Sequence, residues 1–289
     1  MVLRTRAPAK INLTLHVIRR RSDGFHDLES LVAFAGVADI LELDPERPLT
    51  LAIDGPTARA AGHVDDNLVL RAARALKDRV PGLRTGAFRL VKRLPVGAGI
   101  GGGSSDAAGA LRLLAGLNGL RHDDERVHEA ARATGSDVPV CVHPRSRMMR
   151  GTGDRLGDPY VARPFFAVLV NPGLHLETGA VFRRMGLRPG DDLAAGEHPL
   201  VHDRLDHESF LEAIGQGRND MEFAAALLAP VIAEVLAAIR ATPGCRIARM
   251  SGSGSTCFGL YGERGPARRA MAAILARHPD WWVKATALR

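Results

Sequence analysis

The sequence predicts an α+β protein built from two domains, residues 1–158 and 159–289. It contains the apolar patterns of both strands and helices. Hydrophobic residues alternate in residues 9–17, as in a strand, and recur at helical spacing in residues 107–115. The order of these patterns changes near residues 157–159, where a glycine, an aspartate and a proline follow one another. A chain of 289 residues is long enough for one large domain or two moderate ones.

The first predicted strand covers residues 9–17. Its apolar residues lie on one face, namely Ile11, Leu13, Leu15 and Val17. The other face carries Lys10, Asn12, Thr14 and His16. For Thr14 and His16 we expect the solvated side of a sheet, where the polar residues of an alternating strand usually lie.

Four further elements follow in the first half of the chain. An amphipathic helix begins at residues 66–72, and residues 88–95 have the pattern of a strand. Small and apolar residues then recur at helical spacing from residue 107 until Asn118 and Gly119 end the helix. Another helical stretch covers residues 125–134.

The second half begins with an apolar strand at residues 165–170. A stretch rich in glycine, aspartate and histidine follows at residues 188–208, and a helix is expected from about residue 220 to residue 240. Residues 246–261 have the pattern of two strands joined around residues 251–256.

The composition is that of a soluble globular protein, with 46% hydrophobic and 25% charged residues, and it excludes disordered and fibrous chains. No stretch approaches roughly eighteen uninterrupted apolar residues and the N-terminus has no apolar signal segment, so we expect no membrane partner and a cytoplasmic location. Cys141, Cys245 and Cys257 lack the spacing of a metal finger or redox site, which is consistent with reduced thiols.

The net charge of +7 comes from 39 basic and 32 acidic residues. The basic residues are scattered and only 4% of residues are aromatic, whereas a nucleic-acid surface needs a basic stripe or stacking rings, so no nucleic-acid partner is expected. An anionic substrate explains a modest positive charge equally well. Only four of the basic residues are lysines, namely Lys10, Lys77, Lys92 and Lys284. Lysine and arginine differ chemically, so a lysine in a chain with this bias suggests a position that needs a compact charge.

The most informative segment is residues 95–108, where five glycines in seven positions lead into Ser104, Ser105 and an apolar helical pattern. Glycines let backbone N–H groups turn toward an anion, and the following helix adds the positive end of its dipole. The expected ligand is the phosphate chain of a nucleotide. The alternative is a glycine-rich turn that merely caps the helix.

Three common nucleotide loops do not fit this segment. A Walker A loop needs a lysine directly after its last glycine, and none follows here. Residues 97–102 match the dinucleotide pattern formally, but Asp123 and Asp124 lie in a polar stretch rather than at the end of a second strand. A protein-kinase loop needs a valine where Ser104 stands.

With its triple glycine and paired serines, the segment resembles the phosphate loop of the GHMP small-molecule kinases, above all the branch that acts on a cytidylated methylerythritol. Matching motifs span residues 8–261. The resemblance implies the fold, with an N-terminal ribosomal-protein-S5-like phosphate-loop domain in residues 1–158 and a C-terminal ferredoxin-like α/β-sandwich domain in residues 159–289, meeting across the active cleft.

The resemblance also implies the reaction. The γ-phosphate of ATP is transferred to the tertiary 2-hydroxyl of 4-diphosphocytidyl-2-C-methyl-D-erythritol, a small-molecule cytidylated substrate. The products are ADP and the 2-phosphate, in the non-mevalonate route to isoprenoid precursors.

Residues 8–13 and the Phe25–His26 pair resemble the first motif of this branch. The resemblance implies that Asn12 contacts the substrate, that Phe25 stacks on the cytosine and that His26 hydrogen-bonds the edge of the base. Phe25 replaces the usual tyrosine, which keeps ring stacking and loses a hydroxyl. Phe182 matches a second ring on the opposite face of the base, although a lone aromatic there is otherwise a core residue.

The candidate catalytic base is Asp137, in residues 135–139, which match the family motif Gly-Ala-Asp-Val-Pro except for a serine in second place. Pro139 predicts an extended Val138, so Asp137 is expected on a turn and not in a helix. Without the other motifs, an aspartate there is a typical turn residue. We expect Lys10 to hold Asp137 and to steady charge on the acceptor oxygen, because positioning matters more than strong basicity in phosphoryl transfer.

The expected ATP-binding residues belong to the glycine segment and its neighbourhood. Those in the segment are Pro95, Gly97, Gly99, Gly101, Gly102, Gly103, Ser104 and Ser105. The resemblance adds Asn67 and Lys92 as neighbours of the adenine, with a helix cap for Asn67 and a solvated strand end for Lys92 as alternatives. Residues 251–254 resemble a third glycine motif, for which we expect a second phosphate contact rather than a plain hairpin.

No protein metal ligand is predicted. His198 and His202 are four residues apart, but Pro199 disfavours the helix that would bring them to one face. Magnesium is expected to arrive on the phosphates of ATP. We expect the chain to be a monomer or a homodimer.

Two alternatives stay open. Another GHMP kinase, of the homoserine or mevalonate type, shares the glycine segment but has no reason to hold Phe25 and His26 against a cytosine. A nucleotide-sensing or nucleic-acid-binding protein binds its ligand without releasing ADP.

Overall fold

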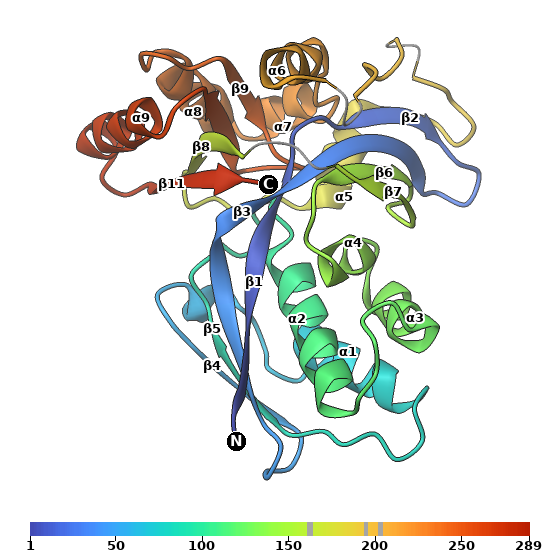
Figure 1. Cartoon of the computed structure of the whole chain (residues 1–289). Coiled ribbons are helices and arrows are strands. Elements are labelled where there is room, and N and C mark those ends of the chain that lie inside the picture. Colours follow the sequence, from blue (N-terminus) through green and yellow to red (C-terminus); the bar gives the residue numbers. More distant parts are fainter. Residues whose placement is uncertain (161–163, 194–195, 202–204) are drawn as a thin grey trace. The chain divides into compact units, whose positions relative to one another are not determined.

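The computed structural model describes residues 1–160, 164–193, 196–201 and 205–289 (Figure 1). Its backbone contacts group the chain into two compact units. The first unit contains Met1–Lys10, Val37–Val96 and Gly101–Pro144, and the second contains Ile11–Gly36, Gly97–Ile100 and Arg145–Arg289. Each unit is thus assembled from three separate segments, and the predicted domain boundary between residues 158 and 159 stays a prediction.

The strands of the first unit are β4 (Thr50–Asp54), β5 (Ala87–Val91) and parts of the long strands β1 (Leu3–Asn12) and β3 (His26–Asp44). β5 pairs antiparallel with β3 and parallel with β4, and β1 pairs with β3. The strand predicted at residues 88–95 is β5. It ends at Val91, and the N–H groups of Arg93 and Leu94 then donate to the side chain of Asp39 instead of to a neighbouring strand.

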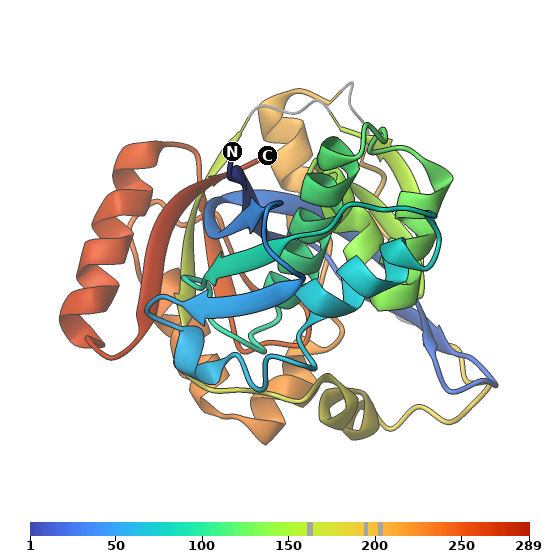
Figure 2. The ribbon, with the colours of Figure 1, turned by 90° about the horizontal axis from the view of Figure 1, so that it is seen from below.

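The helices of the first unit are α1 (Leu68–Lys77), α2 (Gly102–Leu117), α3 (Glu125–Thr134) and α4 (Val138–Val142), with a short 3-10 helix at Ala58–Ala60. The helix predicted at residues 125–134 is confirmed by α3. α1 packs on α2 and α3, and its apolar side is buried there (Figures 1 and 2).

In the second unit, β8 (Phe165–Asn171) lies between β10 (Cys257–Tyr261) and β11 (Trp282–Leu288), and β9 (Ile247–Met250) pairs with β10. All of these pairs are antiparallel, and they confirm the strands predicted at residues 165–170 and within residues 246–261. β3 also pairs with β2 (His16–Arg20) and β6 (Arg147–Gly151), and β6 pairs with β7 (Arg155–Pro159).

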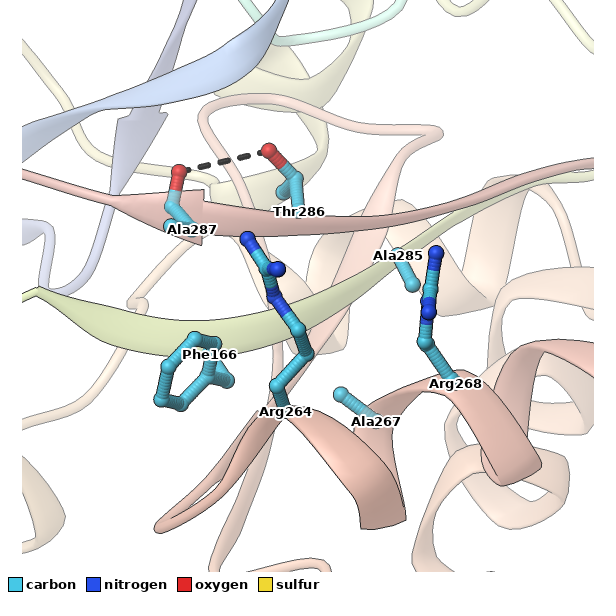
Figure 3. A pocket seen from close by; sticks show the side chains of 7 residues that line it. All are labelled: Phe166, Arg264, Ala267, Arg268, Ala285, Thr286 and Ala287. Carbon is cyan, nitrogen blue, oxygen red and sulfur yellow. Dashed lines mark hydrogen bonds between the residues drawn. The ribbon is translucent and has the colours of Figure 1, made fainter.

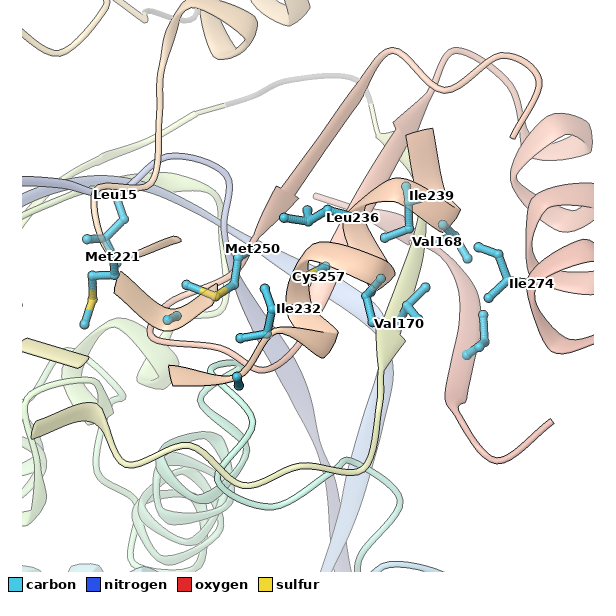
Figure 4. Packing of buried hydrophobic residues seen from close by; sticks show 14 of the residues in the cluster. Leu15, Val168, Val170, Met221, Ile232, Leu236, Ile239, Met250, Cys257 and Ile274 are labelled. Carbon is cyan, nitrogen blue, oxygen red and sulfur yellow. The ribbon is translucent and has the colours of Figure 1, made fainter. Parts of the chain in front are cut away.

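The helices of the second unit are α5 (Thr178–Met185), α6 (His207–Gln216), α7 (Glu222–Leu228), α8 (Val231–Arg240) and α9 (Arg264–Arg277). α8 and α9 pack on the β8 to β11 strands. Figure 4 shows Ile232, Leu236 and Ile239 of α8 in the same buried cluster as Val168 and Val170 of β8. None of the helices in the described part of the chain is long and apolar enough to cross a membrane.

The helix predicted from about residue 220 to residue 240 is interrupted. α7 ends at Leu228 and α8 begins at Val231, because Pro230 lacks the N–H group that a continuous helix needs. Ala229, the residue before this proline, has φ −139° and ψ 84°, which is the non-helical conformation that a following proline favours.

The strand predicted at residues 9–17 is divided between β1 and β2, and the expected solvated face was wrong. Thr14 and His16 are both 0% exposed. Thr14 Oγ1 accepts the N–H of Leu31, and His16 Nε2 accepts the N–H of Arg218. Thr14 Oγ1 and His16 Nε2 therefore serve hydrogen bonds inside the second unit, whereas His16 Nδ1 is buried without a hydrogen-bond partner within the described residues.

Candidate active site

The glycine-rich turn, residues 93–101, joins β5 to α2. Gly99 and Gly101 have φ of +72° and +59°, a left-handed conformation that other residues rarely adopt. Space is also missing at Gly99, since a Cβ atom there would lie 2.4 Å from the carbonyl oxygen of Ser251. At these two positions the turn therefore needs glycine for its backbone shape.

α2 begins at Gly102, inside the glycine run, and not after the two serines as predicted. Gly101 precedes the helix with left-handed angles. The first N–H groups of any helix have no carbonyl partner within it, and here they belong to Gly102, Gly103 and Ser104. The positive end of the helix dipole thus coincides with the glycines, which suits an anion.

A second loop, residues 251–254, supports the turn within the second unit. Ser251 Oγ accepts the N–H of Asn12 at 3.1 Å and donates to the carbonyl of Gly99 at 3.0 Å. A Cβ atom on Gly252 would lie 2.7 Å from the same carbonyl oxygen. Ser253 Oγ is also bonded, to Thr178 Oγ1. These serine hydroxyls act as internal supports, and the predicted phosphate contact of this loop stays a prediction.

Lys10 and Asp137 form an ion pair beside the end of the turn. Lys10 Nζ lies 2.7 Å from Asp137 Oδ2, and the side chains are 4% and 34% exposed. A Cβ atom on Gly101 would lie 3.2 Å from Lys10 Cβ, so the lysine stem packs directly against the turn. The predicted contact between Lys10 and Asp137 is confirmed, whereas their catalytic roles stay predictions.

Asp137 has helical backbone angles, φ −87° and ψ −7°, and directly precedes α4. The expected extended conformation of Val138 was wrong, since Val138 and Pro139 are the first two residues of this helix. Proline is tolerated in a first turn because its missing N–H would have no partner there. The carboxylate of Asp137 is therefore held at the start of a short helix.

Lys92 follows β5 and lies in a buried charge cluster with Asp39 and Asp106. Its Nζ is 2.6 Å from Asp39 Oδ2 and 2.8 Å from Asp106 Oδ2. The three residues are 3%, 0% and 2% exposed, so the solvated strand end considered for Lys92 was wrong. A Cβ atom on Gly102 would lie 3.6 Å from Lys92 Nζ, which places the ammonium next to the start of α2.

Burial and charge act in opposite directions in this cluster. Burial raises the pKa of Asp106 to about 8, although the ammonium of Lys92 opposes the rise and the carboxylate of Asp39 adds to it. Burial by itself would lower the pKa of Lys92, but the carboxylates of Asp106 and Asp39 outweigh it and raise that pKa. Near pH 7, Lys92 is charged and Asp106 carries a proton.

Other predicted ATP-binding residues have structural contacts. Asn67 Oδ1 accepts the N–H of Val69 at 3.0 Å, which confirms the helix cap, while an adenine contact stays a prediction. Ser105 Oγ donates to the carbonyl of Pro8 at 2.7 Å and fastens the first turns of α2 to β1. Ser104 is half-buried. Pro95 is also half-buried.

The predicted acceptor residues lie in the second unit. The rings of His26 and Phe182 are stacked, with centroids 3.9 Å apart and planes 9° apart. Phe25 is 63% exposed. Burial, with a contribution from Arg20, lowers the pKa of His26, so its imidazole is neutral near pH 7. The imidazole covers a face of Phe182, and the predicted contact of both residues with a base stays a prediction.

Asn12 is held by its amide nitrogen. Asn12 Nδ2 donates to Ser30 Oγ at 2.7 Å. Asn12 Oδ1 is buried and has no hydrogen-bond partner within the described residues. A buried acceptor without a partner costs about 1–3 kcal/mol, and a hydrogen-bond donor on a bound substrate would remove that cost.

The histidines considered as metal ligands are placed differently. His198 Nε2 shares a 2.7 Å hydrogen bond with Thr14 Oγ1, and His202 lies outside the described residues. Burial, followed by the charge of Arg218, lowers the pKa of the neighbouring His16 to about 3, which keeps it neutral. Within the described ranges, no three His, Cys, Asp or Glu side chains gather to hold a metal ion.

A cavity of about 160 Å³ lies in the second unit between α9, β8 and β11 (Figure 3). Its lining consists of Phe166, Arg264, Ala267, Arg268, Ala285, Thr286 and Ala287, none of which is a predicted site residue. Figure 3 shows Arg264 and Arg268 projecting from α9 toward β11, as residues four apart on one helix face do. This cavity does not belong to the candidate active site.

Sequence analysis missed Asp39 and Asp106. Each had a signal, because Asp39 interrupts an apolar strand pattern and Asp106 stands at the start of a helix that is otherwise small and apolar. A charged residue in such a place is almost never buried unless it is paired. The partner came from a distant part of the sequence, so the pairing itself could not be deduced.

Comparison with known proteins gives consistent results. The N-terminal domain of the GHMP kinases matches residues 67–145, and their C-terminal domain matches residues 200–280. The 4-diphosphocytidyl-2-C-methyl-D-erythritol kinase of Methylobacterium radiotolerans is 60% identical over 289 residues, covering 100% of this chain and 99% of the relative. The enzyme of the same name from Xanthobacter autotrophicus is 56% identical over 291 residues, with 100% and 99% covered.

Solved structures agree. A crystal structure of 4-(cytidine 5'-diphospho)-2C-methyl-D-erythritol kinase matches with a TM-score of 0.76 and 35% identity over 99% of both chains. A homoserine kinase from Cytophaga hutchinsonii matches with a TM-score of 0.70 at 17% identity, over 99% of this chain and 94% of that one, which shows a shared fold alone.

Proposed function

This chain belongs to the GHMP kinase family and within it to the 4-diphosphocytidyl-2-C-methyl-D-erythritol kinases, and from that premise we propose its reaction. It transfers the γ-phosphate of ATP to the 2-hydroxyl of 4-diphosphocytidyl-2-C-methyl-D-erythritol. The products are ADP and the 2-phosphate, for isoprenoid precursor synthesis by the non-mevalonate route. A cytoplasmic location is part of the proposal.

The observation that carries the proposal is the Lys10–Asp137 pair next to Gly101. A glycine-rich turn at a helix start can hold phosphates in many proteins. A partly exposed carboxylate, held 2.7 Å from a buried ammonium beside that turn, adds a group that can receive a proton. The combination is what a kinase for an alcohol requires.

In the proposed reaction Asp137 orients the 2-hydroxyl and accepts its proton. The oxygen forms a bond to the γ-phosphorus, and the bond to the oxygen that bridges the β- and γ-phosphorus atoms breaks. Phosphoryl transfer passes through a loose transition state, so the alignment of Asp137 contributes more than its basicity. Lys10 keeps the carboxylate in place and balances charge on the attacking oxygen.

The phosphates of ATP are assigned to the glycines and serines of residues 97–105, with Pro95 beside them. Asn67 and Lys92 remain proposed neighbours of the adenine. Magnesium is proposed to arrive on the phosphates of the nucleotide, because this ion binds phosphate oxygens and keeps few protein ligands. When bound, such an ion neutralises phosphate charge.

The cytidine end of the acceptor is assigned to Phe25, His26 and Phe182, with Asn12 as a further polar contact. The contact of His26 with Phe182 supports this assignment, because it brings two of the predicted base-binding residues together. A base is bound by stacking on such a ring for about 1–3 kcal/mol. Phe25 is exposed, so its ring is accessible to the opposite face of a base.

The test is ADP release from the purified protein. We expect ADP release that depends on 4-diphosphocytidyl-2-C-methyl-D-erythritol, with little release on 2-C-methyl-D-erythritol or homoserine. Equal activity on an alcohol without the cytidylyl group favours another GHMP kinase. Binding of ATP with no ADP release on any alcohol favours a nucleotide sensor and would overturn the proposal.

A further inference from the structure

The buried charge cluster defined by Lys92, Asp39 and Asp106 connects both ends of the glycine-rich turn. Asp39 comes from β3, Lys92 follows β5, and Asp106 lies in α2, one turn from its start. These three places all belong to the first unit, with Asp39 and Lys92 in Val37–Val96 and Asp106 in Gly101–Pro144. The glycine-rich turn lies between Lys92 and Asp106 in the sequence. The contact between these two side chains therefore links the chain before the turn to the chain after it.

The start of the turn is held by Asp39. Its Oδ1 accepts the N–H of Leu94 at 2.9 Å and also that of Arg93, while its Oδ2 binds Lys92 Nζ. Asp39 is 0% exposed, so these bonds do not compete with water. The two peptide units that lead from β5 into the turn are thus fixed to β3.

The end of the turn is held by Asp106. Its Oδ2 accepts from Lys92 Nζ at 2.8 Å, and the ammonium lies 3.6 Å from the place where a Cβ atom of Gly102 would be. The other oxygen, Asp106 Oδ1, is buried without a hydrogen-bond partner among the residues that the structure describes. Asp106 Oδ2 therefore ties α2 to Lys92, the same lysine that binds Asp39 at the start of the turn.

Stability alone does not account for this arrangement. Replacing a buried ion pair by apolar residues of similar volume is often neutral or even stabilising, because charges lose hydration on burial. Here a second carboxyl group is buried beside the ion pair, which adds a polar group that loses its hydration. Hydrogen bonds of charged groups are directional, and apolar contacts are not. Each hydrogen bond of the cluster therefore fixes the orientation of a particular group.

We propose that Lys92, Asp39 and Asp106 are positioning residues that fix both ends of the glycine-rich turn, so that its N–H groups converge on the phosphates of ATP. The inference rests on the proposed function, in which this turn binds ATP. Lys92 affects ATP binding through the shape of the turn, because its ammonium is already bonded to Asp39 and Asp106. Lys92 is also a proposed neighbour of the adenine, so Asp39, for which no contact with the nucleotide is proposed, is the residue that separates positioning from direct contact.

The experiment compares Lys92→Met with Lys77→Met as its matched control, because Lys77 is exposed at the end of α1. The dissociation constant of ATP is measured by calorimetry, and KM for ATP, KM for the cytidylated alcohol and kcat are measured by ADP release. Circular dichroism at the assay temperature establishes that each variant is folded.

For Lys92→Met we expect the dissociation constant and KM of ATP to rise roughly tenfold to a hundredfold, as a misplaced binding group causes, with a smaller change in KM for the alcohol. Lys77→Met leaves all of these constants unchanged. Asp39→Asn is measured in parallel, since it keeps the shape of the side chain, removes its charge and changes a residue with no proposed contact with the nucleotide. We expect it to raise the dissociation constant of ATP as well, and it also serves if Lys92→Met does not fold.

Unchanged affinity for ATP in the folded variant overturns the inference. An equal rise in KM for ATP and for the alcohol also overturns it, because that indicates a general loss of structure. Failure of the proposed function is a separate result, in which the wild-type protein binds ATP but releases no ADP. The calorimetric comparison of variants then still tests the positioning role.

Discussion

The first unit contains two lysine–aspartate arrangements next to neighbouring glycines, and they differ in charge balance and exposure. Lys10 has one described carboxylate partner, Asp137, whose side chain is 34% exposed. Lys92 has two, Asp39 and Asp106, and their side chains are 0% and 3% exposed. The same pair of residue types therefore occurs once beside solvent and once in the interior.

The difference indicates which arrangement can do chemistry. A carboxylate that reaches solvent can receive a proton from a substrate and pass it to water. A carboxylate that is buried with an ammonium and a second carboxylate has no such route, and its orientation is fixed by its hydrogen bonds. We therefore assign Asp137 to catalysis and the Lys92 cluster to positioning.

The largest expected effect distinguishes Asp137 from the cluster directly. Asp137→Asn removes the proton acceptor and keeps the shape of the side chain, so kcat should fall by roughly 10²–10⁴-fold. The affinity for ATP should stay nearly unchanged, because Asp137 does not hold the turn. Turnover and calorimetric ATP binding check both parts, and near-normal turnover would contradict the catalytic assignment.

The two lysines should differ in their effect on stability. Lys92→Met leaves the buried carboxyl groups of Asp39 and Asp106 without their ammonium, which should lower the free energy of unfolding by about 3–5 kcal/mol. Lys10→Met leaves Asp137 in contact with water, so the loss should be about 1 kcal/mol or less. Urea unfolding measures both variants, and equal losses would remove the distinction between the two sites.

The pH dependence of stability should come from Asp106. Burial raises the pKa of Asp106 to about 8 in the folded protein, whereas in the unfolded chain an aspartate titrates near about 4. Between these values the folded state binds more protons than the unfolded state, so the free energy of unfolding falls as pH rises.

The matched variant for this effect is Asp106→Asn, which does not titrate at this position. The stability of the wild type relative to Asp106→Asn should decrease between pH 5 and pH 8, and urea midpoints at four pH values measure the difference. A constant difference across this range, or an increase with pH, would show that Asp106 is not protonated in the folded protein.

The smallest expected effects come from the adjacent glycines. Gly101 has φ +59° and its added Cβ would lie 3.2 Å from Lys10 Cβ, so Gly101→Ala should cost about 1–2 kcal/mol and disturb Lys10. Gly102 begins α2, and its added Cβ would make an ordinary contact with Lys92 Nζ, so Gly102→Ala should cause no loss of stability. Thermal unfolding of both variants tests the contrast, and a larger loss at Gly102 would reverse it.

Much of the fold follows from local patterns. The helix at Glu125–Thr134 and the strands around residues 251–256 agree with periodicity and turn residues, because these signals depend only on near neighbours. The same reasoning failed where packing or a proline decided the outcome. Thr14 and His16 were expected in solvent and are buried, and Pro230 divides a predicted helix.

The candidate site was predictable to the extent that its residues occur in motifs. Lys10, Asp137 and the glycines stand in segments that resemble those of a known family, and the contact between Lys10 and Asp137 was expected. Asp39 and Asp106 were not identified, although each is a charged residue in an apolar pattern. No short-range signal joins them to Lys92, because Asp39 is 53 residues and Asp106 is 14 residues away from it in the sequence.

Motifs and short-range patterns were enough to predict the type of protein, the glycine-rich turn and the residues available for catalysis. The burial of Lys92 between Asp39 and Asp106, and the partial exposure of Asp137, became visible only once the chain was folded. The reason is physical. Backbone shape depends on neighbouring residues, whereas burial and the strength of a charge pair depend on which distant segments exclude water around it.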